Sequence, residues 1–292
     1  MPSAGMRGAL AAARLLLENV KFEHTIFALP FAYIGMVLAA RGLPTLWQFF
    51  WITVAMASAR TFAMSLNRLI DRELDRRNPR TRSRPIPSGR LSLGQVGLLA
   101  ALSLAILALA AWLLTPLTFR LFPLALVFLV GYHYTKRFTW LSHYVLGITD
   151  AAAPMGAWIA VTNSMDLPAY LLGLAVASWI GGFDVIYACQ DVEFDRANGL
   201  HSIPARFGIA TGLWVARASH LVTALALIAT GVVLGLGPVY YLGCLVAAAL
   251  LAYENSLVKP DDLSRLNLAF FNVNGYLAVA VFGFTLAAVL LG

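Results

Sequence analysis

Charged residues are scarce in this 292-residue chain. Asp, Glu, Lys and Arg together make up 12% of it, whereas hydrophobic residues make up 60%. A soluble domain of this size needs far more polar surface to cover its core. Apolar runs of about 20 residues, the length that crosses bilayer hydrocarbon as a helix, recur along the chain. The composition excludes a soluble protein and predicts an integral membrane protein in contact with the lipid bilayer.

Cysteine is also nearly absent, since Cys189 and Cys244 are the only two and lie in separate segments. They provide neither a disulfide framework nor the paired spacing of a thiolate metal site. The net charge of +7 and the pI of about 9.7 would suggest a nucleic-acid partner in a soluble protein. Here the hydrophobicity excludes nucleic acid, and the positive charge between apolar runs indicates membrane topology and local anion binding.

The apolar runs predict an all-α, polytopic membrane fold with about nine transmembrane helices in a single domain over residues 1–292. Turn-forming residues such as Asn163-Ser164 and Gly237-Pro238 separate the runs. The predicted spans are residues 24–40, 47–69, 92–114, 119–135, 143–162, 168–187, 210–235, 238–254 and 267–291.

Lys and Arg are distributed unevenly between the loops. Seven arginines lie between Arg72 and Arg90 alone, and others follow the fourth, sixth and eighth spans, whereas the opposite side has only Arg41 and Arg120. By the positive-inside rule the N-terminus and the loops after even-numbered spans are cytoplasmic. The two most polar loops, residues 67–90 and 184–207, are therefore expected to face the cytosol together.

These two loops contain a repeated acidic motif. Residues 67–78 read NRLIDRELDRRN and residues 187–198 read YACQDVEFDRAN. Two aspartate pairs keep one separation of 120 residues: Asp71 with Asp191, and Asp75 with Asp195. Each motif closes an even-numbered span and is followed by an Ile-Pro pair. The pattern indicates a duplicated helical unit whose copies face one another.

Aspartates at positions i and i+4 lie on one helical face about 6 Å apart, so both can reach one cation. Oxygen ligands without His or Cys favour Mg²⁺, which is usually bound by one or two carboxylates together with substrate phosphates. Asn67, one turn before Asp71, could add a neutral oxygen. Such carboxylates are often only a solvated helix end paired with Arg. Two copies in register at membrane depth, where charge is costly, favour a metal and diphosphate site instead.

Basic residues near the motifs suit the same chemistry. The run from Arg80 to Arg84 is dense enough to bind phosphate oxygens, and Lys136 and Arg137 close the fourth span, where they could face the same cavity. A diphosphate leaving group needs its charge stabilised as the carbon–oxygen bond breaks. For a single arginine, a purely topological role is the alternative.

At these residues the chain resembles the UbiA superfamily of intramembrane prenyltransferases. The family pattern has Asn-x-x-x-Asp-x-x-x-Asp in the first motif and Asp-x-x-x-Asp in the second. Further similar features are Arg80-Thr81-x-x-Arg84-Pro85 and the Asp184-x-x-Tyr187-Ala188 segment before the second motif. The resemblance covers nearly the whole chain, and the two motifs together are highly specific.

The resemblance implies a nine-helix bundle around a central cavity that the two motif loops cap on the cytosolic side. Mg²⁺ would bind there through Asp71, Asp75, Asp191 and Asp195, and Tyr187, Asn67 and Asp184 would line the polar site. A polyprenyl diphosphate would ionise to an allylic cation, which an aromatic acceptor then attacks. The implied location is a bacterial or archaeal cell membrane with the active site facing the cytoplasm.

The acceptor implied is an aromatic quinone precursor. Segments such as Gly182–Tyr187 and Leu200–Pro204 resemble the subgroup assigned to the futalosine route to menaquinone, whose acceptor is 1,4-dihydroxy-6-naphthoate. The rival acceptor is 4-hydroxybenzoate of the ubiquinone pathway. Lys21 or His24 could meet the acceptor carboxylate, and an interface role is the alternative for both.

Two other classes of function remain open on sequence alone. A prenyltransferase acting on haem, chlorophyllide or a lipid would share the aspartates and differ in its acceptor. A transporter can also contain internal repeats and intramembrane carboxylates, but its site is expected near the bilayer midplane rather than at helix ends beside Arg clusters.

Overall fold

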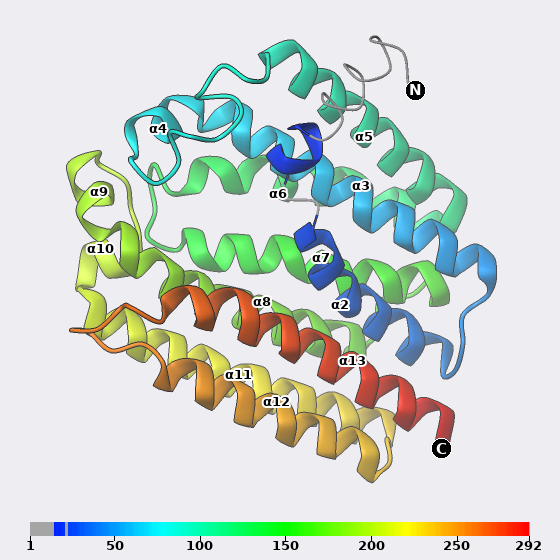
Figure 1. Ribbon diagram of the computed structural model, residues 1–292. Coiled ribbons are helices and arrows are strands. Elements are labelled where there is room, and N and C mark those ends of the chain that lie inside the picture. Colours follow the sequence, from blue (N-terminus) through cyan, green and yellow to red (C-terminus); the bar gives the residue numbers. More distant parts are fainter. Residues whose placement is uncertain (1–14, 21–22, 292) are drawn as a thin grey trace, which may run out of the picture.

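The computed structural model describes residues 15–20 and 23–291, and it describes no side chain for residues 23–28 or Phe271. Across this part of the chain the fold is helical (Figure 1). The helices of 18 or more residues are α2 (Glu23–Ala40), α3 (Leu46–Ile70), α5 (Leu93–Leu114), α6 (Pro116–Thr135), α7 (Ser142–Thr162), α8 (Leu167–Ala188), α11 (Ile209–Leu234), α12 (Pro238–Ser256) and α13 (Asn274–Leu291).

Short elements connect the long helices near the acidic motifs. They are α4 (Arg72–Arg77), the 3₁₀ turn η1 (Cys189–Asp191), α9 (Val192–Ala197), α10 (Ile203–Phe207) and the π-helical turn η2 (Leu268–Val273). Figure 1 shows α4, α9 and α10 gathered at one end of the bundle. The two acidic loops therefore meet at the same end, as the sequence predicts.

The all-α membrane fold is confirmed, and each predicted apolar run corresponds to a long helix. Among the described residues, seven segments are both long and apolar enough to cross a membrane. The remaining two helices are α12, which falls short of that criterion, and α2, of which Leu29–Ala40 forms a shorter apolar stretch. The predicted count of nine membrane crossings stays a prediction, as does the side on which the N-terminus lies.

Local sequence signals fix where several helices begin and end. Thr45 and Ser92 form capping boxes with Gln48 and Gln95 at the starts of α3 and α5. Pro116 and Pro238 begin α6 and α12, where a missing backbone N–H costs nothing. Asn163 ends α7 in the left-handed conformation, with φ of 54°.

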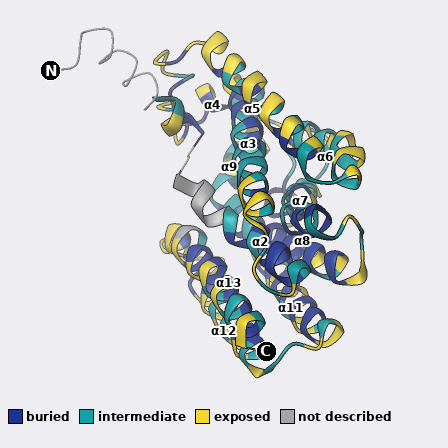
Figure 2. Ribbon diagram, turned by 90° about the vertical axis from the view of Figure 1, so that its right-hand side faces the viewer, coloured by how far each residue is buried: buried dark blue, intermediate teal, exposed yellow. Residues whose placement is uncertain are grey.

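Helix α8 is the central element of the bundle and packs against α7 and α11. Two glycines allow close approach of neighbouring helices: Gly147 lies against the backbone of Ala177, and Gly35 against that of Pro154. Figure 2 shows exposed residues along the outer sides of α5 and α6. Large apolar side chains such as Leu98 and Trp112 are exposed there, which suits contact with lipid rather than water.

Candidate active site

One cavity of about 790 Å³ connects the acidic motifs to the apolar interior of the bundle. Its mouth carries the carboxylates of Asp71, Asp75, Asp191 and Asp195, and its depth is lined by apolar side chains of α3, α6 and α7. The structure therefore brings both motifs to one cavity.

The first motif lies at a break between two helices. Asp71 ends α3 and precedes α4, with φ of −92° and ψ of 6°. The backbone N–H of Asp75 still donates to Asp71 O at 2.8 Å, so the helical turn survives the break. Both residues are buried, at 3% and 7% exposure.

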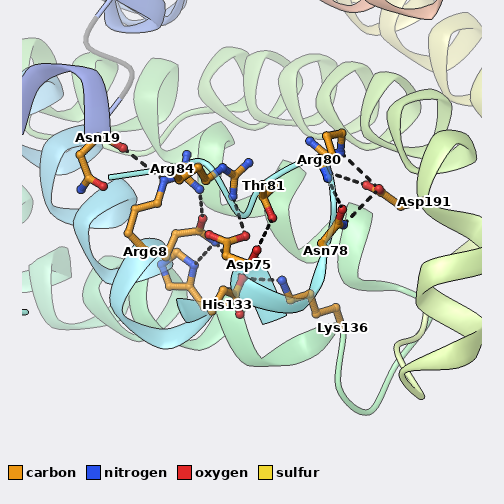
Figure 3. Close-up of polar contacts among 12 residues, drawn as sticks. Asn19, Arg68, Asp75, Asn78, Arg80, Thr81, Arg84, His133, Lys136 and Asp191 are labelled. Carbon is orange, nitrogen blue, oxygen red and sulfur yellow. Dashed lines mark hydrogen bonds and ion pairs between the residues drawn. The ribbon is translucent and has the colours of Figure 1, made fainter. Parts of the chain in front are cut away.

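Three cations pair with the first motif, and Figure 3 labels two of them, Arg84 and Lys136. Lys136 Nζ and Arg137 Nη2 each pair with Asp71, the latter at 2.8 Å, and Arg84 Nη1 pairs with Asp75 Oδ1 at 2.7 Å. Lys136 and Arg84 line the cavity, whereas Arg137 is not among its lining residues and also donates to the backbone O of His133. The structure thus brings all three cations to the first motif.

The second motif is held by one cation from the first loop. Arg80 donates to both oxygens of Asp191, from Nε at 3.3 Å and from Nη2 at 2.6 Å, and to the hydroxyl of Tyr187 from Nη1 at 2.9 Å. Partial burial acts to lower the pKa of Arg80, but Tyr187 and the nearby carboxylates outweigh burial and raise this pKa. The guanidinium therefore stays charged and links the two motif loops.

The other carboxylates near the second motif have neutral partners. Asp195 Oδ2 accepts from Ser202 Oγ at 2.9 Å. Asp184 Oδ2 lies 2.7 Å from His143 Nδ1, while His143 Nε2 accepts from the backbone N–H of Ile203. Nε2 must be unprotonated to accept, so Nδ1 carries the ring proton and donates it to Asp184. Asp184 lines the cavity as predicted, and its carboxylate is bound by His143.

Asn67 presents its amide nitrogen to the first motif. Its Oδ1 accepts from Arg68 Nη1 at 2.9 Å, and a guanidinium can only donate, so the amide orientation is fixed. Asn67 Nδ2 therefore faces Asp71 Oδ2 at 3.2 Å and His133 Nδ1 at 3.3 Å. In this arrangement the oxygen that was expected to reach a cation is engaged by a buried arginine.

Three polar residues that the sequence motifs do not include lie deeper in the cavity. Arg60 of α3, Tyr132 of α6 and Asp150 of α7 line it together and interact electrostatically. Arg60 Nε is buried and has no hydrogen-bond partner among the described residues. The available signal was two charged residues, Arg60 and Asp150, within predicted spans, where charge is costly and usually functional.

Two predicted candidates cannot be placed. Lys21 and the side chain of His24 lie outside the described residues. The other predicted site residues all lie at or beside the cavity.

The donors at the mouth suit a hard cation. They are carboxylate oxygens without nearby thiolates, and Asp75 Oδ2 is buried with no hydrogen-bond partner in the described part of the chain. Among the described residues, however, no three His, Cys, Asp or Glu side chains already form a metal-binding group. A cation bound by several of these aspartates would replace some of their present partners.

Comparison with known proteins identifies the class. Residues 28–276 match the UbiA prenyltransferase family. The chain is 34% identical over 246 residues to a 4-hydroxybenzoate octaprenyltransferase of Aeromonas salmonicida, covering 84% of both chains. It is 32% identical over 254 residues to an enzyme of the same name from Vibrio cholerae, covering 85% of this chain and 86% of the other.

Solved structures of UbiA homologs share the fold of this chain. The apo structure of a UbiA homolog from Aeropyrum pernix superimposes with a TM-score of 0.84 at 32% identity, over 91% of this chain and 98% of the other. A UbiA homolog from Archaeoglobus fulgidus, bound to GPP and Mg²⁺, shares the fold with a TM-score of 0.67 at 18% identity, over 94% and 99% of the two chains. The fold and site define a membrane-embedded prenyltransferase, and the chain belongs to the UbiA prenyltransferase family.

Proposed function

We propose that this enzyme transfers a polyprenyl group from polyprenyl diphosphate to an aromatic quinone precursor. One observation carries the proposal: two aspartate motifs share the mouth of a single, mostly apolar cavity, and Arg80 joins them. A diphosphate needs several cations around it, while its isoprenoid tail needs an apolar trough. The cavity provides both environments within one continuous space.

The four motif aspartates would hold Mg²⁺ together with the diphosphate. The metal would supply electrostatic stabilisation of the leaving diphosphate. Lys136, Arg84 and Arg80, which pair with motif carboxylates, would exchange them for phosphate oxygens of the donor. Arginine suits this exchange because its planar guanidinium binds carboxylate and phosphate with the same paired geometry.

Arg60 is the residue best placed to receive the acceptor. Its side chain lines the cavity below the motifs, and its Nε lacks a hydrogen-bond partner in the described structure. Both 4-hydroxybenzoate and 1,4-dihydroxy-6-naphthoate carry a carboxylate, which would accept a hydrogen bond from the Arg60 guanidinium. Asp150 interacts electrostatically with Arg60 and partly offsets its positive charge in the cavity.

The acceptor itself has support from two directions. The relatives named 4-hydroxybenzoate octaprenyltransferase favour 4-hydroxybenzoate. The segments Gly182–Tyr187 and Leu200–Pro204 favour 1,4-dihydroxy-6-naphthoate through their resemblance to the menaquinone subgroup. We propose 4-hydroxybenzoate first and the naphthoate second.

We further propose that residues 1–292 form one domain in a bacterial or archaeal cell membrane, with the cavity mouth and the N-terminus on the cytoplasmic side. The excess of Lys and Arg in the loops at the motif end supports this orientation.

A transfer assay tests the proposal. Detergent-purified protein receives Mg²⁺, a radiolabelled polyprenyl diphosphate and each acceptor in parallel, with Asp71→Asn and Asp191→Asn as controls. We expect one acceptor to be prenylated, with the activity lost on chelation of the metal and in both variants. Folded protein that prenylates neither acceptor would contradict the quinone assignment. Activity that survives chelation would contradict the metal site.

A further inference from the structure

A buried polar network lies outside the acidic motifs, where α8, α12 and α13 meet. Its centre is Asn274, the first residue of α13. Asn274 Oδ1 accepts from Trp179 Nε1 at 2.7 Å, and Asn274 Nδ2 donates to Glu254 Oε1 at 2.8 Å. An indole N–H can only donate, so the amide orientation is fixed. Glu254 is fully buried, and a buried carboxylate in a membrane bundle calls for a specific role.

The same amide terminates a π-helical turn. Asn274 Nδ2 also lies 3.2 Å from Ala269 O and 3.0 Å from Phe270 O. These two carbonyls belong to η2, whose wider turn departs from the hydrogen-bonding pattern of an α-helix. Glu254 and Trp179 fix the amide through hydrogen bonds, and the amide in turn bonds two carbonyls of η2. The network therefore determines where the side chains of η2 project.

Phe270 of this turn reaches the active-site cavity. It lines the cavity together with Phe183 and Tyr187. Its ring stacks on Tyr187 with centroids 4.0 Å apart and meets Phe183 edge-on at 5.2 Å. Tyr187 in turn accepts a hydrogen bond from Arg80, the residue that joins the motifs. Phe270 thus forms part of an aromatic wall next to the proposed diphosphate site.

We infer that Asn274, held by Glu254 and Trp179, is a positioning residue that sets Phe270 in this aromatic wall and thereby protects the allylic cation from water. The inference rests on the proposed function. The allylic carbon–oxygen bond breaks with its electron pair leaving on the diphosphate. The cation then forms a bond either to an acceptor ring carbon, which loses its proton, or to water, which gives a prenyl alcohol and a proton. An aromatic face stabilises a cation and excludes water from it.

The test measures the ratio of prenyl alcohol to prenylated acceptor with radiolabelled donor in the full-length protein. Asn274→Leu removes the amide at similar size, and Phe270→Leu removes the ring directly. We expect both variants to raise the ratio roughly tenfold, the equivalent of about 1.4 kcal/mol in relative barrier heights. The KM for the donor should stay within about twofold, because the motif aspartates and their cations are untouched.

Two further variants separate positioning from general destabilisation. Glu254→Gln keeps an oxygen acceptor for Asn274 and should retain the wild-type ratio, whereas Glu254→Leu should behave like Asn274→Leu. Tyr240→Phe is the matched control, since Tyr240 is buried and donates to Leu227 O away from the cavity. It should lower the melting temperature without changing the ratio.

The outcomes are distinguishable. A Phe270→Leu variant with the wild-type ratio would overturn the inference, even if Asn274→Leu failed to fold. An equal rise in the ratio for Tyr240→Phe would overturn it as well. Wild-type protein that transfers no prenyl group would instead contradict the proposed function, on which the inference depends.

Discussion

The two acidic motifs repeat in sequence but differ in their surroundings. Asp71 and Asp75 are buried and paired with three cations, Lys136, Arg137 and Arg84. In the second motif Asp191 is partly exposed and is paired with Arg80, while the partner of Asp195 is a serine hydroxyl. The first motif is thus surrounded by more cations than the second, although Asp75 Oδ2 has no hydrogen-bond partner among the described residues.

This difference suggests an order of events. A divalent cation would displace fewer ion pairs at the second motif than at the first. Arg80, which pairs with the second motif, would then be available to the diphosphate. The carboxylates of both motifs would therefore contribute to metal binding. The basic residues around them would affect where the metal enters and where phosphate binds.

The largest expected effect is loss of one carboxylate from either motif. Asp71→Asn and Asp191→Asn should each reduce kcat/KM by about 10²- to 10³-fold, because the proposed metal site would lose one carboxylate charge. Initial rates at saturating Mg²⁺ measure both. A variant of one motif with nearly wild-type kcat/KM would show that the motifs do not act together.

Replacing the cation that joins the motifs should have the next largest effect. Arg80→Gln should lower kcat/KM for the donor about 10- to 100-fold, since hydrogen bonds between charged groups contribute roughly 1.5–3 kcal/mol. Arg82→Gln, in the same loop, is the matched control and should remain close to wild type. Equal losses in the two variants would indicate a general effect of loop charge.

Removing a cation from the first motif should strengthen Mg²⁺ binding and weaken diphosphate binding. Lys136→Gln should strengthen Mg²⁺ binding by donor-free protein about three- to tenfold, because a competing charge at Asp71 is gone. The same variant should bind the diphosphate more weakly. Isothermal titration calorimetry measures both affinities, and weaker binding of both ligands would contradict competition between Lys136 and the metal.

The smallest effect is expected from loss of the hydroxyl that donates to Asp195 in the second motif. Ser202→Ala removes from Asp195 one hydrogen bond that a hydroxyl donates, and it should reduce kcat/KM about threefold. Ser88→Ala, at an exposed loop hydroxyl, serves as the control. A loss of a hundredfold for Ser202→Ala would place this hydroxyl among the groups essential for the reaction.

Much of this organisation follows from local sequence signals. Apolar run length locates the long helices, and caps such as Thr45 and Asn163 place their ends. The separation of 120 residues identifies the motif aspartates, and Lys136 was expected near them because it closes an adjacent span. These signals are short-range or repeat in the sequence, so they can be recognised without knowing how the helices pack.

The remaining features depend on tertiary contacts. Arg80 reaches Asp191 across 111 residues of sequence, and the sequence pattern that contains Arg80 does not indicate this partner. Arg60 and Asp150 come from different helices that only packing brings to one cavity. The role of Asn274 depends on an irregular turn, η2, which apolar periodicity does not reveal.

The most direct test of the account is whether both motifs together bind one metal–diphosphate unit. A non-reactive prenyl thiolodiphosphate would be titrated calorimetrically into wild-type, Asp71→Asn and Asp191→Asn protein, each with Mg²⁺ and with chelator. We predict tight binding by wild-type protein only with Mg²⁺, and at least a tenfold weaker affinity in each variant. Equal affinity with and without Mg²⁺, or full affinity in either variant, would contradict a site built jointly from the two motifs.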